Sequence, residues 1–246
     1  VIANSQPTAE LARNLGVAAE KIRIVHPGVT LPTAPQSPAA LQDFRQRHQL
    51  GKRRLLLSVG RLTTRKGLRE FVQQALPAIV QAAPDTLLVV VGDAPADSLH
   101  ASVQTRASIQ AVADAAGIGQ HLRFLGVITD PQELACAYES ASLHIFPVRK
   151  LPGDPEGFGM VAIEAAAHGL PTVAFATGGI VDAVAEGESG HLVAPGAYPS
   201  LAQAALQMLA DGPGAWQTRA SAFAAQFAWP TLGNRMLEAL SVKSTL

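Results

Sequence analysis

Short runs of leucine and valine alternate with alanine-rich segments of helical spacing along most of this chain. Apolar residues three and four positions apart indicate a helix, whereas a short continuous apolar run between turn residues is typical of a buried strand. Apolar strands that alternate with helices form parallel sheets, because helices must cover both faces of such a sheet. The sequence therefore predicts an α/β fold, in which a Rossmann-like parallel sheet carries helices on both faces.

This pattern defines the expected elements. Strands are expected at residues 1–4, 22–25, 55–59, 86–91, 122–125, 143–146, 172–175 and 191–193. Helices are expected near residues 7–15, 38–49, 66–83, 97–116, 130–140, 158–168, 178–185, 198–211, 213–227 and 230–241. Pro77 lies inside the segment 66–83, and because proline cannot continue a regular helix, we expect a kink or a shifted boundary there.

The loops at one edge of this sheet are the expected binding site. Open parallel sheets bind ligands at the carboxyl ends of their strands, near the point where the strand order reverses. The loops after residues 59, 91, 125 and 146 all contain glycine, or a charge near glycine.

Composition narrows the classes of function. The 19 basic and 19 acidic residues give a net charge of zero, so we expect no nucleic-acid partner. No apolar run approaches the roughly 18 residues that a membrane span needs, and no signal peptide is visible. The single cysteine, Cys136, fits a reducing compartment and is expected to be a small buried residue. We therefore expect a cytoplasmic protein without a transmembrane segment.

Two cations bracket the loop after the expected strand 55–59. Arg61 follows Gly60, and Lys66 opens the next helix. A guanidinium donates two parallel hydrogen bonds and an ammonium adds a compact charge, a combination that suits a diphosphate. Arg65 could replace one of the two, but Lys66 at the helix start is better placed. The alternative interpretation is a pair of solvated surface cations.

Two acidic residues accompany a glycine-rich turn within residues 154–172. Glu156 lies in the turn, and Glu164 follows eight positions later in a helix of small residues. Bare amides at a helix start attract anions, and carboxylates accept hydrogen bonds from hydroxyls, so a phosphorylated sugar suits the segment. Glu156 could instead be only a charge at a helix start. Glu164, on an otherwise apolar helix, needs either a ligand or an arginine partner.

The order of these segments resembles the family 4 glycosyltransferases of the GT-B fold, and more narrowly the carboxyl-terminal, donor-binding half of mannosyl- and glucosyl-type members. The resemblance covers essentially the whole chain and rests on Gly60-Arg61, Lys66-Gly67, Val91-Gly92-Asp93, Arg123-Phe124-Leu125-Gly126, Glu156-Gly157-Phe158-Gly159, Glu164-Ala165 and Gly169-Leu170-Pro171. It implies that residues 1–37 are the tail of an amino-terminal domain plus the interdomain linker. Residues 38–229 would be the donor-binding domain, and residues 230–246 a helix that crosses back to the amino-terminal domain.

The resemblance also implies a role for each matching residue. Arg61, Lys66 and Glu156 are the expected catalytic residues: the two cations would hold the donor diphosphate, and Glu156 would contact the sugar. Glu164 would accept hydrogen bonds from the ribose hydroxyls. The other expected donor-binding residues are Gly60, which lets the backbone approach the donor, Gly126 and Val127 beside the base, and Gly157, Phe158 and Gly159 through their backbone amides.

The implied reaction is a retaining transfer of a hexose, such as mannose or glucose, from a nucleotide diphosphate sugar to an acceptor hydroxyl. No metal or other cofactor is expected, because cations and a helix terminus can neutralise the leaving diphosphate. The acceptor, a glycan or a lipid-linked sugar, would bind through a missing amino-terminal domain. We therefore expect this chain to bind the donor but to transfer little sugar alone. The full-length protein would be cytoplasmic or peripheral at the inner face of the membrane.

Other classes of protein stay open. A non-catalytic nucleotide-sugar binding module would carry the same cations and carboxylates, and a GT-B epimerase or phosphorylase would share the fold. A dinucleotide-dependent oxidoreductase needs Gly-x-Gly-x-x-Gly after its first strand. Residues 55–67 offer only Gly60 and Gly67 around two cations, which speaks against this class.

Overall fold

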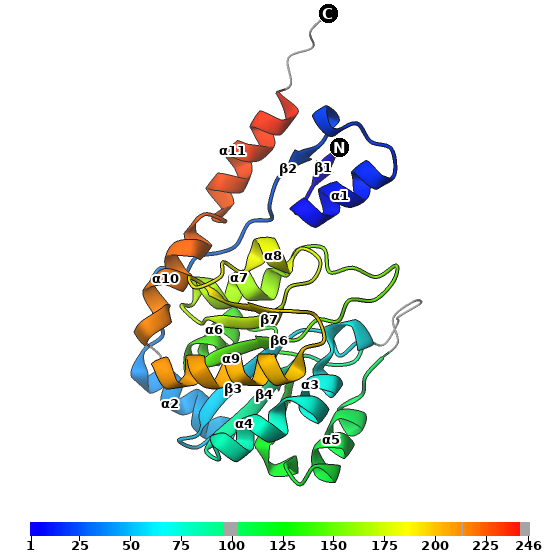
Figure 1. Ribbon diagram of the computed structural model, residues 1–246. Coiled ribbons are helices and arrows are strands. Elements are labelled where there is room, and N and C mark those ends of the chain that lie inside the picture. Colours follow the sequence, from blue (N-terminus) through cyan, green and yellow to red (C-terminus); the bar gives the residue numbers. More distant parts are fainter. Residues whose placement is uncertain (96–102, 213, 242–246) are drawn as a thin grey trace, which may run out of the picture.

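The computed structural model describes residues 1–95, 103–212 and 214–241 of the chain. Its main body is a parallel sheet of six strands in the order β5-β4-β3-β6-β7-β8, as Figure 1 shows. The strands are β3 (Arg54–Val59), β4 (Thr86–Val91), β5 (Leu122–Gly126), β6 (Leu143–Phe146), β7 (Thr172–Phe175) and β8 (Gly190–Val193). The predicted Rossmann-like parallel sheet is thus confirmed, and each of its strands lies within a residue or so of the expected range.

Helices cover both faces of the sheet. The helices of the sheet domain are α2 (Pro38–Arg47), α3 (Leu68–Gln74), α4 (Leu76–Ala82), α5 (Arg106–Ala115), α6 (Pro131–Ser140), α7 (Met160–Ala167), α8 (Ile180–Ala183), α9 (Tyr198–Asp211) and α10 (Gly214–Ala225). Alternate residues of β3 point to opposite faces: Leu56 packs in the core under α3, α4, α5 and α9, and Leu55 and Leu57 pack under α2 and α6. β3 is therefore apolar on both faces, as a strand inside a covered parallel sheet must be.

Some helix boundaries differ from those expected. The predicted interruption at Pro77 is confirmed, because Ala75 separates α3 from α4 and Pro77 lies in the first turn of α4. The helix expected at 97–116 begins only at Arg106. Thr105 and Ser108 form a capping box there, and Val103 pairs with Thr63 as an isolated bridge. Residues 97–102 of that expectation lie outside the described residues.

The segment expected as a helix at 178–185 is helical over only half of its length. Only residues 180–183 are helical, because glycines at positions 178 and 179 make a tight turn before α8.

A small βαβ unit precedes the sheet domain. It consists of β1 (Ile2–Ala3), α1 (Gln6–Asn14), a short 3-10 helix at Ala19–Lys21 and β2 (Arg23–Ile24), with the two strands parallel. Asp182 on α8 connects this unit to the sheet domain, because it accepts hydrogen bonds from the Gln6 amide and from His26. In Figure 1 the last helix, α11 (Trp229–Leu240), runs beside this unit, away from the sheet.

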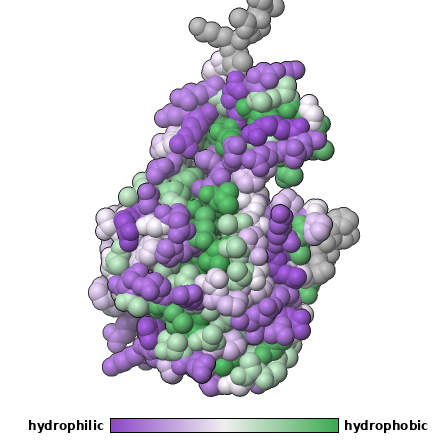
Figure 2. Space-filling model, viewed as in Figure 1, coloured by the Kyte–Doolittle hydropathy of each residue, from purple (hydrophilic) through white to green (hydrophobic). Residues whose placement is uncertain are grey.

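Hydrophilic and hydrophobic residues are unevenly distributed on the visible surface. Figure 2 shows hydrophilic residues over most of the amino-terminal unit and α11, and hydrophobic residues in a band across the middle of the sheet domain. Within the described residues, no helix combines the length and the apolar character needed to cross a bilayer.

We expect Leu56→Ala to lower the free energy of unfolding by about 2–5 kcal/mol, because it leaves a cavity between β3 and the helices above it. Leu56 is fully buried, whereas Leu15, at the end of α1, is 86% exposed. Leu15→Ala should therefore change stability by no more than about 0.5 kcal/mol. Urea denaturation of both variants measures the difference, and equal effects would contradict this description of the core.

Candidate functional site

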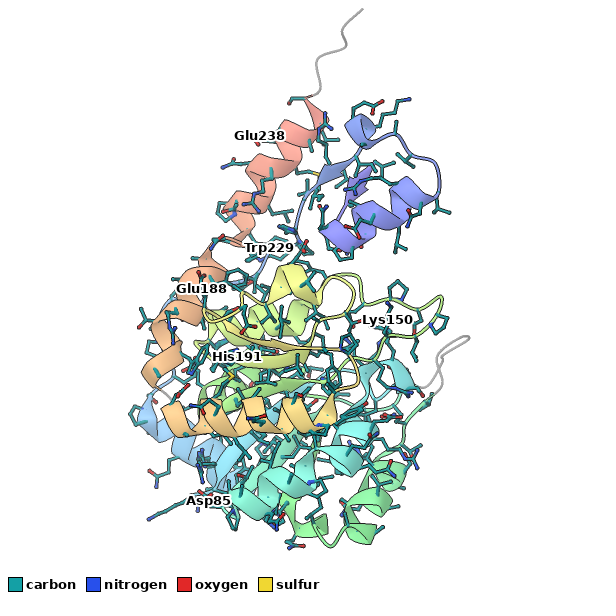
Figure 3. The ribbon with its side chains drawn as sticks, in the orientation of Figure 1. Asp85, Lys150, Glu188, His191, Trp229 and Glu238 are labelled. Atoms are coloured by element: carbon teal, nitrogen blue, oxygen red, sulfur yellow. The ribbon has the colours of Figure 1, made fainter. Side chains whose placement is uncertain are left out.

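The candidate site lies where the strand order reverses. β3 pairs with β4 on one side and with β6 on the other, so the loops that follow β3 and β6 leave the sheet side by side. Doubly wound sheets bind their ligands at this position. Figure 3 shows the two ends of the strands. Lys150, which follows β6, lies beyond their carboxyl ends, where the site is, and Asp85, just before β4, lies at their amino ends.

Lys66 and Glu156 form an ion pair between these two loops. Lys66 Nζ lies 2.7 Å from Glu156 Oε2, and the two side chains are 17% and 12% exposed. Arg65 Nη1 donates to the same carboxylate oxygen, and Arg65 Nε lies 3.0 Å from Asp154 Oδ1. The structure thus brings together two of the three predicted catalytic residues and adds Arg65 and Asp154 to them.

Lys66 is also held by the sheet beneath it. Its ammonium lies 4.9 Å from the centroid of the Phe146 ring, at the end of β6, within the range of a cation–π interaction. Burial lowers the pKa of Lys66, and the charges of Arg65 and Arg61 lower it further, although Glu156 opposes the shift. The ammonium is therefore largely removed from water and depends on Glu156 and the Phe146 ring for its stabilisation.

The glycine turn before α7 leaves a row of backbone amides without partners. Gly159 caps the helix in a left-handed conformation with φ 97°, and no side chain accepts from the first turn. The amides of residues 157–161 have no hydrogen-bond partner in the described part of the chain. Gly179 packs against this turn so closely that a Cβ would lie 2.0 Å from the Gly157 carbonyl oxygen. Unpaired amides at the positive end of a helix dipole favour an anion.

A cavity of about 270 Å³ adjoins this turn. Lys66, Glu156 and residues 157–159 line it from the sheet domain, and Asn4 and Pro27 line it from the amino-terminal segment. Both the cation and the helix start therefore face one space.

Glu164 lines an adjoining cavity of about 640 Å³, which shares Pro27 and Met160 with the first. Tyr138 of α6 donates a hydrogen bond from its hydroxyl to Glu164 Oε2 over 2.9 Å. Burial and the charge of Glu164 raise the pKa of Tyr138 well above its ordinary value, so the hydroxyl stays protonated. The partner that Glu164 needs inside the protein is therefore a tyrosine and not an arginine.

The other predicted donor-binding residues lie around this centre. Arg61 is exposed, and Gly60 lies beside the Lys66 stem, where a Cβ would be 3.9 Å from Cε. Gly126 ends β5, two strands from β3, and Val127 is 67% exposed; neither lines the two cavities. The Phe158 side chain is buried and stacks on His26 at 5.4 Å, so only its backbone can meet a ligand.

Sequence reasoning missed three parts of this arrangement. It did not identify the Arg65–Glu156 contact, the hydroxyl of Tyr138, or Asn4 on the wall of the smaller cavity. A signal existed for Tyr138, because a tyrosine in a helix of small apolar residues needs a partner for its hydroxyl when buried. No group of His, Cys, Asp and Glu side chains among the described residues could hold a metal ion.

Fold and site together define a doubly wound α/β domain with a cationic loop and a helix start at its switch point. The Glycosyl transferases group 1 family model matches residues 53–211, and the chain belongs to this family.

Relatives agree with this assignment. The chain is 31% identical over 225 residues to a GDP-mannose-dependent alpha-(1-6)-phosphatidylinositol monomannoside mannosyltransferase of Mycolicibacterium smegmatis, with 87% of the chain and 55% of the relative covered. It is 34% identical over 245 residues to D-inositol 3-phosphate glycosyltransferase 1 of Catenulispora acidiphila, with 96% and 56% covered. The chain thus spans little more than half the length of these relatives.

Solved structures show the same fold. Anabaena HepE in complex with UDP superimposes with a TM-score of 0.84 at 27% identity, over 98% of this chain and 63% of HepE. Sucrose-phosphate synthase from Thermosynechococcus elongatus gives a TM-score of 0.77 at 28% identity, over 98% of this chain and 57% of that protein.

The buried His144 beneath the site predicts a dependence of stability on pH. His144 is fully buried on β6, Thr172 contacts its Nδ1, and its Nε2 has no partner in the described structure. Burial lowers its pKa from 6.5 to about 3, so the unfolded chain binds a proton between these values and the folded chain does not. Stability is therefore lost as the pH falls through this window.

We expect this histidine to account for about 2–3 kcal/mol of the stability lost between pH 7 and pH 4.5. His144→Leu removes the titrating group and should flatten the pH dependence by that amount. Urea midpoints of the wild type and the variant at both pH values measure the difference. Parallel pH dependences would show that His144 does not set this loss.

Proposed function

We propose that this chain is the donor-binding half of a retaining glycosyltransferase that transfers a hexose, mannose or glucose, from a nucleotide diphosphate sugar to an acceptor hydroxyl. The observation that carries the proposal is the Lys66–Glu156 pair at the switch point, beside a helix start with unpaired amides. A cation and free amides suit a diphosphate, and a carboxylate beside them suits the sugar hydroxyls.

The spacing along α7 supports the proposal. Glu164 lies four residues beyond Met160, about one helical turn or ~6 Å from the helix start. A nucleoside diphosphate bound with its phosphates at the helix start places its ribose at this distance. Glu164 Oε2 is occupied by Tyr138, and its other oxygen would accept from the ribose hydroxyls.

The charges of the residues on the loops after β3 and β6 suggest a role for each residue in the transfer. Lys66, with Arg61 from the same loop, would neutralise the charge that develops on the departing diphosphate. Glu156 would hold the sugar and stabilise the positive charge of an oxocarbenium-like transition state. In a retaining transfer the acceptor hydroxyl attacks from the face that the nucleotide leaves, and a donor phosphate oxygen takes its proton. The reaction assigned in this way needs no metal ion.

Two similar proteins guide the choice of donor. One is GDP-mannose-dependent, and the structure of HepE contains UDP. Guanosine and uridine diphosphate sugars are therefore the donors to test first. The acceptor, a glycan or a lipid-linked sugar, would be bound by parts of a longer protein.

Arg61→Ala and Lys66→Ala should each weaken the binding of UDP or GDP by roughly 1–3 kcal/mol, about 5- to 150-fold, since each removes charge-assisted hydrogen bonds to phosphate. Isothermal titration calorimetry measures the affinities. Arg54→Ala is the matched control, because Arg54 pairs with Asp85 at the opposite end of β3. An affinity unchanged by Lys66→Ala would remove this residue from the site.

A panel of nucleotide sugars distinguishes the candidate functions. A ligand at 100 times its dissociation constant stabilises the folded state by about 2.7 kcal/mol, so thermal unfolding ranks UDP-glucose, GDP-mannose and their relatives. We expect one of them to raise the melting temperature and reduced dinucleotides to leave it unchanged. We expect the 246-residue chain to show little transfer of its own, and full-rate transfer by this chain would contradict the assignment as a donor-binding half.

A further inference from the structure

Arg65 is a largely buried cation that contacts Glu156 of the site, although the proposed reaction gives it no ligand to hold. Its side chain is 12% exposed, less than that of Lys66 at 17%. A guanidinium that has lost most of its water needs anions or hydrogen-bond acceptors to compensate for the loss. Its partners therefore indicate what it does.

Those partners all belong to the loop after β6. The guanidinium donates through Nη1 to Glu156 Oε2 and lies 3.0 Å through Nε from Asp154 Oδ1. The backbone oxygen of Arg65 accepts a hydrogen bond of 2.8 Å from the Arg149 amide. Arg65 thus fastens the loop after β3 to the loop after β6, at the place where the Lys66–Glu156 pair lies.

The charge balance explains why such a contact is needed. Glu156 Oε2 accepts from Lys66 and from Arg65, so two cations share one carboxylate oxygen. A bare carboxylate beside the unpaired amides of α7 would repel a diphosphate. If Lys66 alone compensated Glu156, its ammonium would be held by the carboxylate and would be less available to a phosphate.

We infer that Arg65 is a positioning residue: it neutralises and fixes Glu156 through a two-carboxylate bridge, so that Lys66 can turn its charge toward a bound diphosphate. This inference rests on the proposed function of the site. Arginine suits the task because its planar fork spans two carboxylates at once and stays charged at every relevant pH.

The test is a double-mutant cycle between Arg65 and Glu156, read out by calorimetric titration of the 246-residue chain with UDP and with GDP. Arg65→Gln should weaken the binding of the preferred nucleotide about tenfold, the scale of one charge-assisted hydrogen bond. In a Glu156→Gln background the same change should alter affinity by less than about twofold, because the carboxylate that Arg65 neutralises is gone. Arg65→Lys, which keeps the charge but cannot bridge both carboxylates, should recover only part of the affinity.

Arg54→Gln is the matched control, because it removes the same charge from an exposed pair with Asp85 and should leave affinity unchanged. An Arg65→Gln variant that binds like the wild type would overturn the inference, and so would an equal loss in the Glu156→Gln background, since that would mean direct contact with phosphate. A wild-type chain that bound neither nucleotide would overturn the proposed function and this inference together.

The folding of the variants is itself informative. If Arg65→Gln alone did not fold, as judged by circular dichroism, the double variant with Glu156→Gln should fold, because it leaves no uncompensated carboxylate. A double variant that also failed to fold would overturn the inference and make Arg65 a residue of the fold only.

Discussion

The pairing of β3 with β6 is the interaction on which the rest of the site depends. Residues Leu56 and Leu57 of β3 pair in parallel with Leu143 and His144 of β6, although almost ninety positions separate them in the sequence. This register brings the loops after the two strands to the same edge. Lys66 on the first loop and Glu156 on the second meet only because these strands are neighbours, so the chemistry of the site follows from sheet topology.

Charges can be buried at this edge because each has a partner. Taking a cation or a carboxylate out of water costs several kcal/mol, and the cost is recovered only by good geometry and further hydrogen bonds. Lys66 meets Glu156 and the Phe146 ring, Arg65 meets Asp154 and Glu156, and Arg149 on the same loop pairs with Glu70 of α3 over 2.9 Å. The backbone amides at the start of α7 differ from these charges, because they have no partner in the described part of the chain. They therefore suggest a place for an anion.

The sequence predicted the sheet well because its central strands, such as β3 and β4, are short apolar runs between turns. Such a run is typical of a buried strand. The loop pattern placed Lys66 and Glu156 at one edge of the sheet, and the family resemblance assigned both residues to one donor site. The residues at which helices begin were harder to predict. α5 begins at Arg106 because of the Thr105 capping box, a local signal that the alanine-rich pattern around it obscured.

Contacts between side chains far apart in the sequence could not be predicted from the sequence. Arg65 and Lys66 are neighbours in a 3-10 turn, and no pattern shows that both meet Glu156, 90 positions away. The contacts of α7 could not be predicted either. Its residues Met160 and Glu164, and His168 directly after its end, lie on one face and line the larger cavity. His168 contacts Glu139, which accepts a hydrogen bond of 2.6 Å from the Gln36 amide, just before α2. One helix thus connects Glu164, which is proposed to hold the ribose, to the segment that leads to the amino-terminal unit.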